Sequence, residues 1–112
     1  MKAGRNQQVI MRYIDAVNDN DKERIQSFFA EDSIFCNLPD EHAVGQEAIW
    51  GAISDIHNNA EQVDWQIDNL CEDESGSVLA EGRVRYLVNG EWRECELNGV
   101  FEVRGCKITQ WH

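Results

Sequence analysis

The dipeptide Asn89-Gly90, placed between two alternating segments, constrains the fold of this 112-residue chain more than any other feature. Asn-Gly favours the two-residue turn of a β-hairpin, because both residues adopt positive φ readily. With such a turn Val88 faces Glu91, and each step away from the turn pairs the next two residues. The sequence therefore predicts one long antiparallel hairpin with strands over 77–88 and 91–103.

The register that this turn sets is consistent with the chemistry of both hairpin faces. On one face, Arg85 lies opposite Glu94 and Arg83 lies opposite Glu96. Each exposed pair of opposite charges contributes roughly 0.2–1 kcal/mol to stability. We expect this charged face to meet solvent and the other face, which is nearly all apolar, to be buried. The apolar face consists of Val78, Ala80, Gly82, Val84 and Tyr86, opposite Phe101, Gly99, Leu97, Cys95 and Arg93.

Two further strands extend the hairpin into a four-stranded meander. Val63, Trp65 and Ile67 alternate with polar residues, the two-residue period of a half-buried strand. The segment 73–76 is rich in turn residues and connects this strand to the hairpin. A last strand is expected over 107–112, after a turn at 104–105.

The first half of the chain has a helical period instead. Apolar residues recur at helical spacing from about 6 to 17 and again from Gly45 to about 57. Between them, Asn20 and Glu23 resemble a capping box and begin a short helix that we expect to close at 30–32. A strand over 33–38 ends at a proline, and 39–44 are expected to form a loop.

This order of elements predicts one domain over residues 1–112. Helix, helix, strand, helix and a four-stranded meander form an α+β fold, with three N-terminal helices packed on a strongly curved, mainly antiparallel sheet. A curved sheet covered by helices encloses a hollow that suits a small ligand.

The net charge and the cysteines limit the classes of partner, compartment and bound metal that we expect for this protein. The chain has 10 Lys+Arg and 21 Asp+Glu and a net charge of −11, which disfavours nucleic acid and anionic membrane surfaces as partners. No uncharged stretch could span a bilayer, and the N-terminal segment does not have the pattern of a signal peptide, so we expect a cytoplasmic protein.

The four cysteines form no CxxC element, and no histidine stands at ligand spacing from them. They are Cys36, Cys71, Cys95 and Cys106. We therefore expect free thiols, no metal and no cofactor.

Four stretches of the chain carry a family resemblance. They are VIMRYIDAV at 9–17, FFAED at 28–32, VGQEAI at 44–49, and GVFEV at 99–103 through KITQW at 107–111. Through them the whole chain resembles the nuclear-transport-factor-like superfamily, and within it the SnoaL-like group that includes limonene-epoxide hydrolase, polyketide cyclases and ketosteroid isomerase. The resemblance implies a cone-shaped α+β barrel with a mixed sheet, and a homodimer paired through the convex sheet face. It does not fix the activity, because this fold serves enzymes and binding proteins alike.

Carried over residue by residue, the resemblance to epoxide hydrolase leaves most of the catalytic groups unmatched. The Tyr-x-Asn that holds the attacking water falls on Phe35-Cys36-Asn37, so only Asn37 is retained. The Arg-x-Asp that protonates the epoxide falls on Gly82-Arg83-Val84, and the water-activating Asp would lie beyond His112. We expect this hydrolase chemistry to be absent in its usual form.

The comparison with ketosteroid isomerase and the cyclases gives the same result. Tyr13 matches the tyrosine that hydrogen-bonds the developing oxyanion, but Asn37 replaces the proton-shuttling Asp and Gly99 the protonated one. An amide cannot accept and return a proton at neutral pH as a carboxylate does. The apolar hairpin face has no carboxylate to serve as the acid of a cyclase.

Three hypotheses follow. The first is a protein that binds a small hydrophobic, carbonyl-bearing or cyclic molecule in an apolar pocket, with Tyr13 and Asn37 orienting the ligand and as the only catalytic candidates. The second is an epoxide-hydrolase-like or polyketide-cyclase-like enzyme with a displaced acid and base, such as Asp40, Glu41 or Asp64. The third is an interaction module that uses the sheet face. The expected pocket residues are Tyr13, Phe35, Asn37, Trp65, Val84, Cys95, Leu97, Phe101 and Trp111.

Each of these side chains also has a purely structural interpretation. Tyr13, Trp65 and Trp111 could be core aromatics, and Asn37 could cap a loop. Cys95 is expected to be a buried structural thiol, because no histidine or cation is evident beside it in the sequence. The charged sheet face could be solvated rather than paired.

Overall fold

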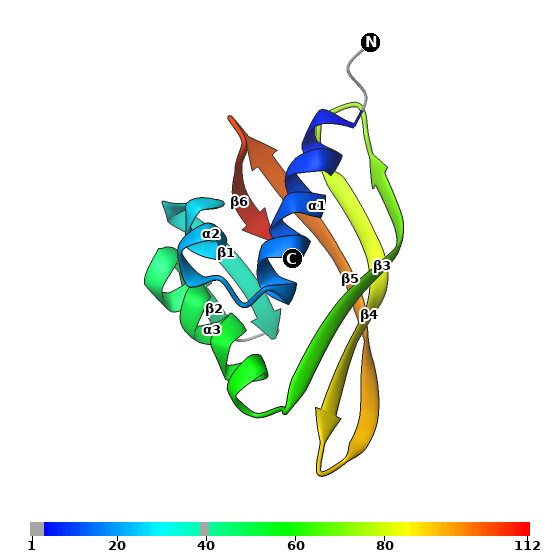
Figure 1. Ribbon diagram of the computed structural model, residues 1–112. Helices are drawn as coiled ribbons and strands as arrows, with labels where there is room; N and C mark the ends of the chain where they lie inside the picture. The colour runs from blue at the N-terminus through cyan, green and yellow to red at the C-terminus, as the bar shows by residue number, and fades with distance from the viewer. Residues whose placement is uncertain (1–3, 39–40) are drawn as a thin grey trace.

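The computed structural model describes residues 4–38 and 41–112 as three helices packed against a six-stranded sheet (Figure 1). The strand order is β2-β1-β6-β5-β4-β3, antiparallel except where β1 runs parallel to β6. This is the expected mixed α+β fold, although the sheet stays open, with β2 and β3 at its edges. The elements are α1 (Arg5–Asn18), α2 (Lys22–Ser27), β1 (Phe29–Leu38), β2 (Glu41–Val44), α3 (Gln46–Asn58), β3 (Gln62–Glu72), β4 (Val78–Val88), β5 (Glu91–Arg104) and β6 (Lys107–Trp111).

The two long helices form where the apolar period predicts them. α1 lies across the sheet in Figure 1 and buries Ile10, Tyr13 and Val17 along one stripe. α3 follows Gly45, whose φ of 92° favours glycine, and buries Ile49 and Ile53. None of the described helices is long and apolar enough to cross a membrane.

The β4–β5 hairpin has the predicted register over its whole length. Pairing runs from Val88 opposite Glu91 to Val78 opposite Phe101. Arg85 lies 4.0 Å from Glu94, as expected for that pair. Arg83 also lies opposite Glu96 as predicted, but its guanidinium forms its ion pairs with Asp68 of β3 at 3.0 Å and Glu94 at 3.9 Å.

Two predictions around α2 are wrong. The N-cap is Asp21, whose side chain accepts a hydrogen bond from the Arg24 amide, whereas Asn20 precedes it with a φ of 52°. The helix also ends at Ser27, and 30–32 already belong to β1. Phe29 pairs with Ile108 of β6, a partner distant in sequence, and this pairing extends the strand toward the helix.

The segment expected as a loop before α3 contains β2. Its described residues pair antiparallel to β1, with Ala43 opposite Phe35 and His42 opposite Cys36. Pro39 and Asp40 between the two strands lie outside the described residues. A strand of this length is too short to give an alternating pattern that identifies it.

A β-bulge bends the long strands. The register of β3 with β4 shifts between Ile67 and Asn69, so that Asp68 is the extra residue. Gly82 faces this bulge, and a Cβ there would lie 2.0 Å from the carbonyl oxygen of Gln66. Only glycine lets β3 and β4 approach this closely.

The turn end of the β4–β5 hairpin projects beyond the helices (Figure 1). Residues 91–96 of β5 are exposed, whereas Leu97 and Phe101 further along the strand are buried. Cys95 is therefore an exposed thiol, and the expectation that it is buried is wrong because it lies in the exposed part of β5 near the hairpin turn.

Candidate functional site

A hollow of about 620 Å³ lies between α3 and the sheet. Residues of α3 border one side, β3, β4 and β5 the other, and β1 and β6 the inner end. Its lining comprises Phe35, Cys36, Ala52, Asp55, Ile56, Asn59, Ala60, Trp65, Val84, Tyr86, Val88, Cys95, Glu96, Leu97, Asn98, Trp111 and His112.

Three aromatic rings form one wall of the hollow. Phe35 meets Trp111 edge to face at 4.3 Å between ring centroids, and Trp65 lies 6.2 Å from Trp111. All three side chains are buried. Asp55 and Glu96 also border the hollow and are exposed, so charge lies where the hollow meets solvent.

Gly99 of β5 creates the space for one of these rings. A Cβ at this position would lie 1.9 Å from Trp111 Nε1. The resemblance to ketosteroid isomerase places an aspartic acid at Gly99, and here the indole occupies the space that such a side chain would need. Trp111 also stacks on Phe101, with centroids 5.1 Å apart and an interplanar angle of 11°.

Most of the residues predicted from the sequence as pocket residues meet at this hollow. Tyr13 and Phe101 are exceptions, because both are fully buried in the core and neither borders the hollow. The side chain of Asn37 lies outside the described part of the structure, although its backbone belongs to β1. Those that do border the hollow are Phe35, Trp65, Val84, Cys95, Leu97 and Trp111.

Tyr13 lies within an aromatic cluster rather than beside the hollow. Its ring packs edge to face against Phe28, Phe29 and Phe101, with ring centroids 5.5 to 6.0 Å apart. Burial raises the pKa of the Tyr13 phenol, and its hydroxyl has no hydrogen-bond partner among the described residues. The hydroxyl is therefore a buried polar group without compensation.

Replacing Tyr13 by phenylalanine should raise the free energy of unfolding by about 1 kcal/mol, because it removes that uncompensated hydroxyl and keeps the ring. Urea denaturation of both proteins measures the change. The affinity for a ligand in the hollow should not change with this substitution. A Y13F variant that is less stable, or that loses ligand affinity, would assign the hydroxyl a role in a hydrogen bond or in ligand contact.

Of the carboxylates expected as displaced catalytic groups, Asp64 is the one whose side chain the structure describes. Asp64 accepts a hydrogen bond from Gln66 Nε2 at 2.7 Å and does not border the hollow. Asp40 and the side chain of Glu41 lie outside the described residues. Within 4–38 and 41–112, no cluster of three or more His, Cys, Asp or Glu side chains could hold a metal ion.

Sequence reasoning does not identify three parts of this region. Ala52 and Ile56 of α3 border the hollow, but their helical period was interpreted only as core packing. Cys36 Sγ lies 3.0 Å from His42 Nδ1, and that pair was missed because β2 was expected to be a loop. Asp55 had no sequence signal that separates it from an ordinary solvated carboxylate.

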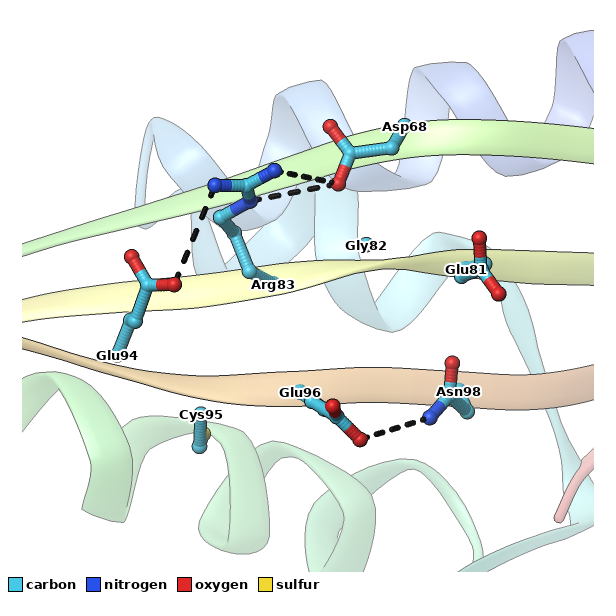
Figure 2. A pocket seen from close by; sticks show the side chains of 8 residues that line it. All are labelled: Asp68, Glu81, Gly82, Arg83, Glu94, Cys95, Glu96 and Asn98. Atoms are coloured by element: carbon cyan, nitrogen blue, oxygen red, sulfur yellow. Dashed lines mark hydrogen bonds and ion pairs between the residues drawn. The ribbon is translucent and has the colours of Figure 1, made fainter.

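A second hollow, of about 410 Å³, lies on the outer sheet face, which is the face turned away from the helices. Figure 2 shows the Arg83 guanidinium directed between Asp68 and Glu94, with Glu81, Glu96 and Asn98 beside them. The side chains of Arg83, Asp68 and Glu94 are each more than a third exposed, so their ion pairs contribute little to stability.

Comparison with known proteins gives a consistent result. The family model of the SnoaL-like domain matches residues 10–111. Bal32a, from a soil-derived mobile gene cassette, superposes with a TM-score of 0.87 at 16% identity, over 99% of this chain and 88% of that one. An LEH-like epoxide hydrolase of M. tuberculosis superposes with a TM-score of 0.82 at 17% identity, over 99% of this chain and 82% of that one. TerC, co-crystallised with polyporic acid, superposes with a TM-score of 0.81 at 15% identity, over 95% of this chain and 87% of that one.

Proposed function

Because this chain belongs to the SnoaL-like domain family, we propose that it binds a small apolar molecule in the hollow between α3 and the sheet. The observation that supports this most directly is the aromatic wall formed by Phe35, Trp65 and Trp111. The volume of about 620 Å³ suits a small organic molecule, since pockets for such ligands measure roughly 300–1,000 Å³. Affinity would come from burial of apolar surface.

A ligand that carries a carbonyl group fits this wall best. The Trp65 indole N–H is buried and has no acceptor among the described residues. A buried donor without a partner costs about 1–3 kcal/mol, and a ligand carbonyl would supply the acceptor once the ring turns its N–H toward the hollow. Binding would then relieve an existing cost as well as bury apolar surface.

Tryptophan fluorescence tests the proposal. Trp50 and Trp92 do not border the hollow, so a W50F/W92F variant leaves only Trp65 and Trp111 to report on it. Titration with 4-phenyl-2-butanone should change the emission along a saturable curve. Butylbenzene, which lacks the carbonyl, should bind more weakly. No saturable change with either compound would reject the proposal.

An epoxide-hydrolase-like or cyclase-like enzyme is the alternative. It is supported by Asp55 and His112, which both border the hollow and could act as a displaced acid and base. The structural similarity to an LEH-like epoxide hydrolase fits the same idea. Turnover of styrene oxide to its diol that is abolished by Asp55→Asn would support this alternative, and activity that is absent or indifferent to that substitution would remove it.

We also propose that the protein pairs with a second copy through its outer sheet face. Leu79 and Trp92 are exposed large apolar side chains on this face, at 45% and 46% exposure. Arg85 lies over the Trp92 ring at 4.9 Å, and the neighbouring carboxylates and Arg83 provide charges of both signs for a two-fold contact. Sedimentation should give a dimer mass that Leu79→Glu reduces to a monomer. A monomeric native protein would contradict this proposal.

We place the protein in the cytoplasm, without a nucleic-acid or membrane partner. All four cysteines are unpaired, which fits a reducing compartment, and the net charge of −11 opposes binding to phosphates. Rapid alkylation during cell lysis tests the compartment: all four thiols should be labelled, and recovery of a disulfide would argue against it.

A further inference from the structure

One pair of side chains at the edge of the hollow has a chemistry that ligand binding does not use. Cys36 of β1 and His42 of β2 face each other across an antiparallel strand pair. Their Sγ and Nδ1 atoms lie 3.0 Å apart. The thiol is half-buried and the imidazole exposed, and Cys36 also borders the hollow. A nucleophilic atom and a base thus lie within contact distance beside the hollow.

We propose that Cys36 and His42 form a nucleophilic site that adds the cysteine sulfur to an apolar α,β-unsaturated carbonyl compound. This inference rests on the proposed ligand hollow for the docking of the substrate. The thiol–imidazole contact itself is independent of any ligand.

The reaction balances without a further reactant. The thiol proton passes to His42 Nδ1 as the sulfur electron pair forms a C–S bond to the β-carbon of the enone. The π electrons of the C=C bond move toward the carbonyl and give an enolate. The imidazolium then returns the proton to the α-carbon, which leaves a saturated thioether adduct and a neutral imidazole.

The other cysteines provide an internal comparison. Cys71, Cys95 and Cys106 are more exposed than Cys36, but none has an imidazole partner among the described residues. If access alone decided reactivity, Cys36 would react last of the four. If the imidazole assists, the least exposed cysteine reacts first. Cys106 is the strictest comparator because it lies exposed in the β5–β6 turn, next to Lys107.

The experiment exposes the native protein to limiting 4-phenyl-3-buten-2-one at pH 7 and follows each cysteine by peptide mass mapping. Cys36 should form the adduct at least about tenfold faster than Cys106, since a positioned base contributes roughly 100-fold or more. His42→Gln should remove this preference. His57→Gln is the matched control, because His57 lies in α3 and does not border the hollow.

Two results would overturn the inference: a Cys36 rate no faster than that of Cys106, or a fast rate that survives His42→Gln. Because His42 is exposed, its substitution leaves the fold intact, and circular dichroism verifies this. The saturated ketone 4-phenyl-2-butanone separates this inference from the proposed function. Saturable binding of that ketone without fast Cys36 addition to the enone would reject the nucleophilic site alone.

Discussion

Gly82→Ala is expected to lower the free energy of unfolding by about 3 kcal/mol, the upper end of the cost of overpacking, and the melting temperature by roughly 10–20 °C. The added methyl carbon would lie 2.0 Å from the carbonyl oxygen of Gln66. Because that oxygen belongs to the backbone of β3, the two strands must separate at the bulge to admit the methyl group.

Gly51→Ala is the matched control. Gly51 lies inside α3, and a Cβ there meets no atom within 4 Å. Alanine is the better helix former, so this substitution should stabilise the protein by about 0.5–1 kcal/mol. Thermal and urea denaturation of both variants measures the two effects. Equal stabilities for both would show that the bulge does not require a close approach of β3 and β4.

Ala52→Phe is expected to weaken binding of 4-phenyl-2-butanone at least about tenfold, equivalent to roughly 1.4 kcal/mol. Ala52 is half-buried and borders the hollow from α3, so a phenyl ring there would occupy volume that the ligand needs. The fluorescence titration in the W50F/W92F background measures the affinity.

Ala48→Phe controls for this substitution. Ala48 lies one helical turn earlier in α3, is exposed, and does not border the hollow. Both variants have the same cost in helix propensity, so a difference between them reports on the position of the ring. Ala48→Phe should keep native affinity. A loss of affinity in both variants, or in neither, would place the ligand elsewhere.

The parts of the fold that local chemistry determines could be predicted from the sequence. The β4–β5 register follows from Asn89-Gly90 and from the charges on facing strands, all within one hairpin. The parts that depend on distant partners could not be predicted. β1 begins at Phe29 because it pairs with Ile108, and Arg83 turns toward Asp68 because a bulge in β3 places that carboxylate beside it.

The candidate site likewise has one part that could be predicted from the sequence and one part that could not. The alternation of β3, β4 and β5 identifies the face that carries Trp65, Val84 and Leu97, and all three border the hollow. The α3 side could not be predicted, because an apolar helical stripe looks the same whether it packs on a core or on a cavity. The Cys36–His42 pair depends on β2, a strand too short for its pattern to be recognised.

A crystal structure of the complex with 4-phenyl-2-butanone tests the central claim most directly. The account predicts ligand density in the hollow between α3 and the strands, with the phenyl ring against Trp111 and the carbonyl oxygen accepting a hydrogen bond from Trp65 Nε1. A hollow filled by the protein's own side chains, or ligand density on the outer sheet face instead, would contradict the account.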